Sequence, residues 1–183
     1  MARTLIYAGP TLYGSGFIPQ KGELLLPPAG QGDLFHGVLR YNPAQIVLID
    51  GVFHQRLSVW IKEILFALVD GVRIIGASSM GALRAAEAWR YGMIGIGAIF
   101  EAYKSGFVED EAWVAMTYDP ETYRPLTEPH CGLAQKRLDA LAAIEFARVT
   151  PIKQPQTNLK KEQVAPFFTP ILDRVLEEDL LYA

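Results

Sequence analysis

The chain has 183 residues, a formal net charge of −3 and a composition that is 50% hydrophobic and 20% charged. That length and apolar content fit one folded domain with a sizeable core and exclude an intrinsically disordered chain. The charge provides no basic surface for a nucleic acid, and no apolar run approaches the roughly 20 residues of a membrane span. Cys131 is the single cysteine, so no disulfide can form within the chain and a reducing, cytoplasmic location is expected.

Strand-like and helix-like segments alternate along most of the chain. Four short apolar runs predict strands, and these are residues 5–8, 23–26, 46–49 and 72–75. Helical spacing or composition predicts helices over residues 33–39, 55–69, 79–90 and 133–147. Such alternation is typical of an α/β fold with a short parallel sheet and right-handed crossovers.

The last part of the chain has a different character. Four prolines interrupt residues 150–169, which predicts an extended arm. A short amphipathic helix is expected after the arm, with its apolar face formed by Ile171, Leu172, Val175, Leu176 and Leu180. Two interpretations of this extension are open: a helix packed on its own domain, or an arm that docks on a partner or is swapped within a dimer.

Three of the predicted strand-end loops are expected to form a ligand site. Ligands of open parallel sheets bind beyond the carboxyl ends of the strands. The loops in question are residues 9–11, which include Thr11, residues 50–54, which begin with Asp50, and the serine-containing turn of residues 76–81. Their convergence is the basis of the predicted site.

The turn of residues 76–81 resembles a nucleophile elbow centred on Ser79. That pattern needs small residues two positions before and two after the serine, and here they are Ala77 and Gly81. The hydroxyl would lie at a helix N-terminus, where the amides of Met80 and Gly81 could stabilise an oxyanion. The alternative is that Ser78 or Ser79 only caps the helix, a contribution of about 1 kcal/mol.

A nucleophilic serine needs a base, and the sequence offers two groups near the expected crevice. Lys62 has apolar neighbours in sequence, and burial would lower the pKa of its amine, but a solvated helix face is the alternative. Asp50 follows an apolar strand, where a carboxylate belongs at the open edge of the sheet, but Asp50-Gly51 is also a common turn pair. Arg84 and Glu87 share one helix face, either as a surface pair or as groups that orient the crevice.

The histidines and the cysteine give weaker signals. His36 falls on a predicted helix, whereas His54 and His130 could reach the crevice from loops. The adjacent pair His130-Cys131 suggests a thiol dyad only weakly, since neighbouring side chains usually point apart. Because these residues lack the spacing of metal ligands, neither a metal nor another cofactor is expected.

Several stretches, in order along the chain, together resemble the TfuA-like family over about residues 3–145. They are residues 8–12 (AGPTL), 32–34 (GDL), 49–53 (IDGVF), 60–65 (WIKEIL), 76–87 (GASSMGALRAAE), 91–95 (YGMIG) and 123–129 (YRPLTEP). The family-typical positions present here are Asp33, Asp50, Lys62, Glu63, Ser79, Arg84, Glu87, Tyr123, Arg124 and Glu128. Thr127, His130 and Cys131 depart from the family pattern, which argues against a catalytic role for the last two.

The resemblance implies an accessory protein that works with a YcaO-type ATP-dependent enzyme in backbone thioamidation of a peptide or protein, as in peptide natural product biosynthesis. It also implies one of two roles. The protein either releases sulfide from a thiocarboxylated ThiS-like carrier, or it docks on the YcaO enzyme and activates it allosterically. The first role is an acyl transfer, so it would use the nucleophile and oxyanion donors of the serine turn.

We therefore expect a single-domain Rossmann-like or flavodoxin-like three-layer fold, with a TfuA-like core over residues 1–147 and an extension over 148–183. Ser79 is the expected nucleophile, Lys62 the base and Asp50 the orienting carboxylate. Residues expected to bind the substrate or carrier are Thr11, Ser78, Met80, Gly81, Arg84, Glu87, Arg124 and Glu128. The expected partners are the YcaO enzyme and a ThiS-like carrier, with no nucleic acid or membrane, and a homodimer is left open.

Overall fold

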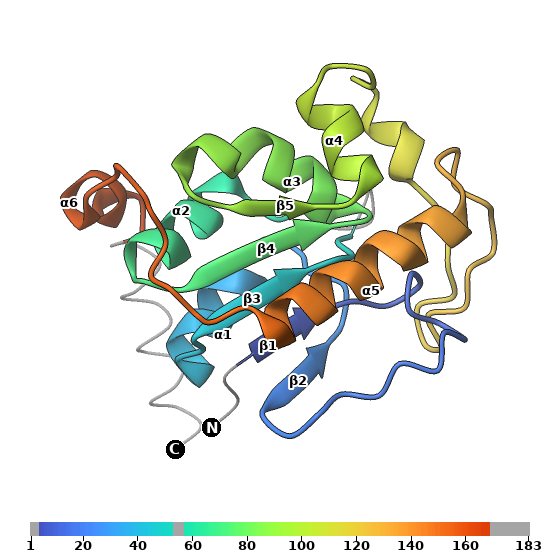
Figure 1. The fold of residues 1–183 in the computed structure, drawn as a ribbon, viewed down its shortest axis with the longest axis horizontal. Helices are drawn as coiled ribbons and strands as arrows, with labels where there is room; N and C mark the ends of the chain where they lie inside the picture. Colours follow the sequence, from blue (N-terminus) through green and yellow to red (C-terminus); the bar gives the residue numbers. More distant parts are fainter. Residues whose placement is uncertain (1–3, 53–56, 169–183) are drawn as a thin grey trace.

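The computed structural model describes residues 4–52 and 57–168, and its centre is a parallel β-sheet of five strands (Figure 1). The strands follow the order β2-β1-β3-β4-β5 across the sheet. Their bounds are Thr4–Tyr7 for β1, Glu23–Leu26 for β2, Gln45–Leu48 for β3, Arg73–Ala77 for β4 and Ile94–Ile96 for β5. This order, 2-1-3-4-5, is that of flavodoxin-like proteins and confirms the predicted fold class.

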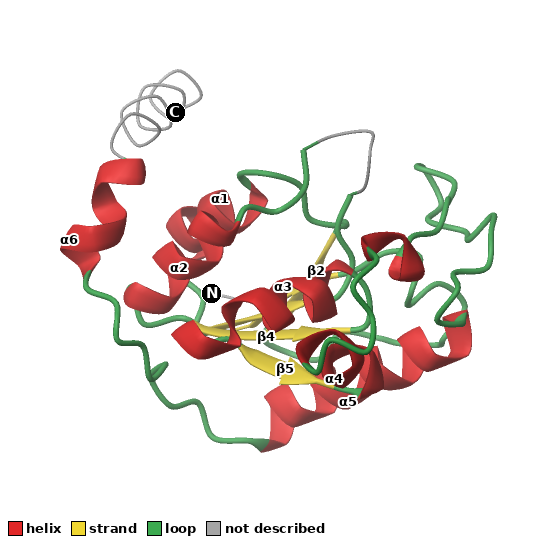
Figure 2. Cartoon of the chain, turned by 90° about the horizontal axis from the view of Figure 1, so that it is seen from above, coloured by secondary structure: helices red, strands yellow, loops and turns green. Residues whose placement is uncertain are grey.

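Helices cover both faces of the sheet and make three layers (Figure 2). The helices are α1 (Asp33–Tyr41), α2 (Ile61–Val69), α3 (Met80–Ala88), α4 (Ala98–Lys104), α5 (Leu133–Val149) and α6 (Lys161–Val164). Side chains of a strand alternate between the faces, so Leu5 and Tyr7 belong to the core beneath α1, α2 and α3. Ile6, between them, packs in the second core beneath α5. No helix in the described part of the chain is long and apolar enough to cross a membrane.

Three labelled elements, β5, α4 and α6, were not predicted, and one predicted helix begins later than expected. β5 and α4 are short, and β5 contains a glycine where it packs closely on α4: a Cβ on Gly95 would lie 2.2 Å from the Phe100 ring. The helix predicted over residues 55–69 begins only at Ile61, because Ser58 forms a bridge with Gly30 instead. Residues 55 and 56 lie outside the described chain.

The C-terminal extension follows the prediction of an extended arm only over residues 150–160, and the prediction is wrong for residues 161–167, which form a helix and a 3-10 turn. Residues 150–160 contain no helix or strand, and α6 and a 3-10 turn (Ala165–Phe167) come next. Phe168 then stacks on Phe35, with ring centroids 4.8 Å apart, and also contacts Phe66. The amphipathic helix expected from Ile171 onward lies outside the described residues.

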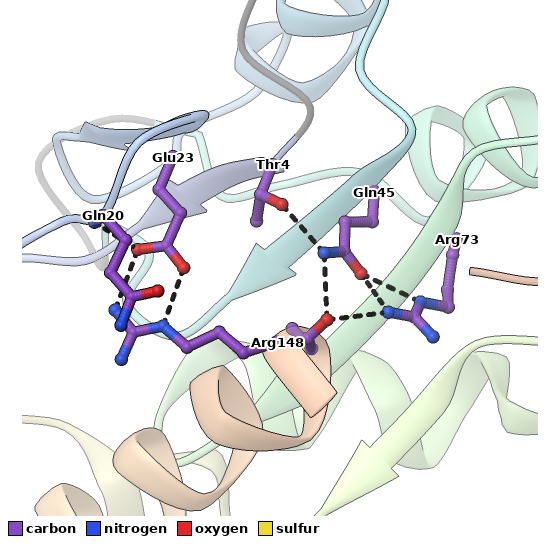
Figure 3. Close-up of polar contacts among 7 residues, drawn as sticks. Thr4, Gln20, Glu23, Gln45, Arg73 and Arg148 are labelled. Carbon is purple, nitrogen blue, oxygen red and sulfur yellow. Dashed lines mark hydrogen bonds and ion pairs between the residues drawn. The ribbon is translucent and has the colours of Figure 1, made fainter. Parts of the chain in front are cut away.

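A polar network at the amino ends of the strands fastens α5 to the sheet (Figure 3). The Gln45 amide donates to Thr4 Oγ1 at 2.8 Å and to the carbonyl of Ala147 at 3.2 Å. The buried Arg73 guanidinium donates to the Gln45 side chain and to the same Ala147 carbonyl. Since Ala147 lies in the last turn of α5, these bonds fix the carboxyl end of that helix.

Candidate functional site

Three loops meet beyond the carboxyl ends of the strands, as predicted from their positions in the sequence. Asp50, which follows β3, accepts hydrogen bonds from the amides of Gly9 and Thr11 at 2.9 and 3.0 Å. Its other carboxylate oxygen accepts the Thr11 hydroxyl at 2.6 Å. The same hydroxyl lies 3.4 Å from Ser78 Oγ in the turn after β4. Asp50 therefore holds the loop after β1 beside the serine turn.

The turn between β4 and α3 is sharp and closely packed. Ser78 takes a positive φ of 69°, which few residues other than glycine adopt, and Ser79 is the N-cap residue of α3. A Cβ on Gly81 would lie 1.8 Å from the carbonyl oxygen of Leu48, so only glycine lets α3 pack this closely on β3. The small residues of the elbow pattern thus serve backbone packing and leave Ser79 at the head of the helix.

Lys136 is the side chain that contacts Ser79. The Nζ of Lys136 donates to Ser79 Oγ at 2.9 Å and to the carbonyl of Val114 at 3.0 Å. Lys136 is fully buried, and this burial lowers the pKa of its amine, while the negative charge of Asp50 acts in the opposite direction. A lysine whose pKa is lowered by burial can lose its proton and accept another from a serine hydroxyl. Ser79 and Lys136 therefore have the arrangement of a serine–lysine dyad.

The donors available for an oxyanion differ from those predicted. The amide of Gly81 donates to the carbonyl of Ile49 at 3.1 Å, so the prediction that it would bind an oxyanion is not met. The Met80 amide, which directly follows Ser79, donates no hydrogen bond among the described residues. Met80 is also the first residue of α3, where the helix dipole favours negative charge. Met80 is thus the donor that remains for this role.

A cavity of about 410 Å³ opens above the dyad. Asp50, Gly51, Ser79 and Lys136 line its floor beyond the strand ends. The rest of its wall comes from the segment between α4 and α5, namely Ala112, Ala115, Met116, Thr117, Tyr118, Thr127, Glu128 and His130, together with Pro10. Figure 1 shows this segment, in yellow and gold, on the side toward which the strand arrows point. Ser79 itself is 3% exposed and lines this cavity.

The structure places Lys62, the predicted base, in other surroundings. Its ammonium lies over the rings of Trp60 and Phe167, 4.8 and 4.0 Å from their centroids. These cation–π contacts hold the side chain at the surface of α2, and Lys62 is not among the residues that line the cavity above Ser79. Lys136, on α5, takes the position beside Ser79 that the sequence had suggested for Lys62.

The other predicted binding residues divide into two groups. Glu128 lines the cavity and accepts the amide of Leu133, at the start of α5, at 2.7 Å. Arg84 instead pairs with Glu87 at 2.7 Å and donates to the carbonyl of Val59, so this pair fastens the segment before α2. Arg124 is exposed and does not line the cavity. His130 lines the cavity mouth, whereas His54 lies outside the described residues.

Lys136 was missed in the sequence, although a signal for it exists. It lies on the buried stripe of α5 with Ala140, Ala143 and Ala147, at the spacing of an apolar helix face. A lysine in such a stripe is rarely fully buried unless it is paired with a group inside the protein. The small alanines around it let α5 approach the sheet closely enough for the amine to reach Ser79.

Comparison with known proteins identifies one family. A family model described as TfuA-like protein matches residues 50–157, which is more than half of the chain. The match includes Asp50, Ser79 and Lys136, and the segment that covers the cavity. A search of curated proteins found no significant match to the chain.

Proposed function

The chain belongs to the TfuA-like family, and we propose that it supplies sulfide to a YcaO enzyme by hydrolysing the thiocarboxylated end of a small ThiS-like carrier protein. Membership of this family supports an accessory role in YcaO-linked backbone thioamidation. The observation that carries the hydrolytic part of the proposal is the 2.9 Å hydrogen bond between Lys136 Nζ and Ser79 Oγ at the floor of a cavity.

The proposed reaction begins when Ser79 Oγ attacks the carbonyl carbon of the thiocarboxylate. Neutral Lys136 takes the hydroxyl proton, and the Met80 amide donates to the oxyanion of the tetrahedral intermediate. The carbon–sulfur bond breaks, Lys136 returns the proton to the departing sulfur, and HS⁻ leaves. Water then cleaves the ester on Ser79, which gives the carrier carboxylate and restores the serine. No oxidant, reductant or cofactor is consumed in these steps.

Burial gives Lys136 the property that this sequence of steps needs. An exposed lysine is almost fully protonated near neutral pH and accepts no proton from serine. Inside the protein the charged form loses its hydration, and the two acceptors of Lys136 are a hydroxyl and a backbone carbonyl, which are both neutral. The backbone carbonyl of Val114 accepts a hydrogen bond from the amine and so helps to hold Lys136 Nζ beside Ser79 Oγ.

Removal of the Ser79 hydroxyl tests the proposal. We expect Ser79→Ala to lower sulfide release from a thiocarboxylated ThiS-like carrier by about 100-fold or more, measured as methylene blue formation. Ser105→Ala is the matched control, because Ser105 is exposed at the end of α4 and, among the described residues, its hydroxyl bonds only to the Ala102 carbonyl. Undiminished release from folded Ser79→Ala protein would contradict the nucleophile assignment.

Added sulfide separates a catalytic role from a docking role. When free sulfide is given to the YcaO enzyme and its peptide, a protein that only releases sulfide becomes dispensable. Under the proposal, Ser79→Ala then supports thioamide formation as well as the wild type does. If the wild-type protein remains necessary at saturating sulfide and Ser79→Ala is harmless throughout, the protein acts by docking on the enzyme.

A further inference from the structure

β2 (Glu23–Leu26) forms an edge of the sheet, and its sequence does little to protect that edge. Within the part of the chain that the structure describes, it pairs only with β1, and three of its four residues are leucine. Its one charged residue, Glu23, is engaged by Arg148 at 2.8 Å. Natural edge strands usually carry lysine, proline or a bulge that prevents another strand from pairing with them. Leu24 and Leu26 pack against the core, so Leu25 is the exposed apolar residue of this edge.

The hydrogen bonds to β1 show which backbone groups of β2 face outward. The carbonyls of Gly22 and Leu26 accept the amides of Thr4 and Ala8 on the β1 side, at 3.1 and 3.0 Å. In a parallel pair, the N–H and C=O of one residue point to the same side, and the side alternates along the strand. Leu25 therefore directs both its N–H and its C=O to the free edge, and its side chain is 40% exposed.

An apolar cavity of about 360 Å³ lies at the carboxyl end of this edge. Its lining consists of Ala8, Gly9, Leu12, Tyr13, Phe17, Leu25, Leu26, Pro27, Thr122 and Tyr123. None of these described lining residues is charged. Cavities of this composition accept apolar side chains, and a strand that adds to an edge is selected through such side-chain pockets.

Two segments, residues 9–12 and 117–127, each contribute to this cavity and to the one above Ser79. The loop of residues 9–12 contributes Gly9 and Leu12 to the apolar cavity and Pro10 to the Ser79 cavity. A hairpin-like segment, residues 117–127, closes through a bridge between Tyr118 and Pro125 and also lines both cavities.

The two cavities are thus neighbours across a thin wall. The ring of Tyr118, in the Ser79 cavity, lies 6.2 Å from the ring of Tyr123 in the apolar cavity. At the base of the wall, a Cβ on Gly9 would approach Pro28 to 2.6 Å and the Tyr123 ring to 3.2 Å. Glycine at this position lets the loop and the segment 117–127 meet.

We propose that the free edge of β2 and the apolar cavity bind the extended carboxyl-terminal tail of the acyl-bearing carrier protein. The tail pairs with the outward N–H and C=O of Leu25 and places an apolar side chain in the cavity. It then continues across the shared wall, so that its terminal acyl group enters the Ser79 cavity. The identity of the tail rests on the proposed function, whereas the extended conformation and the apolar side chain follow from the edge strand and the cavity.

Two substitutions at Leu25 test the proposal, with Ile18 as the matched control. Leu25→Pro removes the outward N–H without breaking a bond to β1, and Leu25→Asp places a charge beside the cavity. Ile18 is 78% exposed and lies outside the lining, so Ile18→Asp adds the same charge elsewhere on the surface. The probe is an unmodified, fluorescently labelled ThiS-like carrier, and its Kd is measured by anisotropy against each full-length variant. A fluorophosphonate that labels Ser79 reports the dyad independently.

We expect both Leu25 variants to weaken carrier binding by at least tenfold, with Ile18→Asp and the rate of Ser79 labelling unchanged. Equal carrier binding by wild type and folded Leu25→Asp would overturn the proposal, even if Leu25→Pro failed to fold. A wild-type dimer that Leu25→Pro converts to monomer without loss of carrier binding would assign the edge to a second copy instead. Failure of the proposed function has a different signature, because the wild-type protein would then bind no carrier.

Discussion

Two clusters of buried polar side chains lie at opposite ends of the same strands, and α5 takes part in both. At the amino ends, Gln45 and Arg73 bind the last turn of α5 through the Ala147 carbonyl. At the carboxyl ends, Lys136 reaches from the first turns of α5 to Ser79. Both clusters contain a cation that is almost completely shielded from solvent, and each adjoins a cavity, but only Lys136 lines its cavity, whereas Arg73 does not line the one beside Gln45 and Ala147.

The difference between the two cations lies in their chemistry and in how many partners each has. The Arg73 guanidinium donates to the Gln45 side chain and to the carbonyls of Ala147, Thr150 and Pro151. A guanidinium keeps its charge in proteins, so this cluster can hold a helix end but cannot move a proton. Lys136 has two neutral acceptors, and burial lowers the pKa of its amine. Burial thus leaves a permanently charged group that holds α5 at one end of the sheet, and an amine with a lowered pKa, the proposed base, at the other end.

Replacement of Lys136 should have the largest effect, and this effect should fall on the reactivity of Ser79 and not on stability. In Lys136→Met the shape of the side chain is kept and the amine is lost, so we expect labelling of Ser79 by a fluorophosphonate to slow by about 100-fold or more. The free energy of unfolding should stay the same or rise, because an apolar group of similar volume replaces a buried amine. Mass spectrometry locates and times the adduct, and chemical denaturation gives the stability.

Lys62→Met is the control for that experiment, because it removes a lysine that lies over two aromatic rings instead of beside Ser79. In the Lys62→Met protein, the fluorophosphonate should label Ser79 at the wild-type rate. The pH profile adds a second criterion: wild-type labelling should rise with pH as Lys136 loses its proton, with an apparent pKa below that of an ordinary lysine. A Lys136→Met protein that labels at the wild-type rate would remove the basis for the dyad.

Replacement of Arg73 should give the opposite result. Arg73→Met removes the guanidinium that donates to Gln45 Oε1 and to the carbonyls of Thr150 and Pro151, while the Ala147 carbonyl keeps the Gln45 amide, and we expect the free energy of unfolding to fall by about 3 kcal/mol. Labelling of Ser79 in the folded fraction should stay within about twofold of wild type, since Arg73 lies at the other end of β4. The measurements are urea denaturation and labelling at low temperature. A large loss of labelling without a loss of stability would show that the two ends are coupled through α5.

Much of the fold could be predicted from the sequence, because the elements that build it have clear patterns. Buried parallel strands read as short apolar runs, and the segment predicted as a strand over residues 23–26 is β2. The strand β5 was missed because Ile94-Gly95-Ile96 is short and its glycine serves contact with Phe100, which only the folded chain brings near. Local pattern thus predicts an element when its neighbours in sequence determine it.

The candidate site shows the same limit. Asp50, Thr11 and the serine turn were predicted together because all of them follow strands, and parallel strands end at one edge. Lys136, the proposed base, could not be placed in the same way, because it projects from a helix that begins more than 50 residues after Ser79. Helical rotation decides which lysine of a helix faces the sheet, and a neighbourhood of apolar residues in sequence did not distinguish Lys62 from Lys136. The stripe of buried alanines on α5 indicates which face of that helix packs on the sheet, and Lys136 lies on that face.

The smallest expected effect concerns the ion pair at the rim of the amino-end cluster. Arg148 binds both carboxylate oxygens of Glu23, at 2.8 and 2.9 Å, and this hydrogen bonding lowers the pKa of the Glu23 carboxyl. A lowered carboxyl pKa stabilises the fold above the ordinary pKa of glutamate, and this stabilisation is lost as the pH falls through the lowered value. We expect Glu23→Gln to cost less than about 1 kcal/mol near neutral pH, as for other ion pairs near the surface. Denaturation of both proteins over a series of acidic pH values should show their stabilities converging at the lowest pH. A constant difference across that series would mean that Glu23 contributes through packing on β2, and that only the interior bonds of Gln45 and Arg73 fasten α5 by polar contacts.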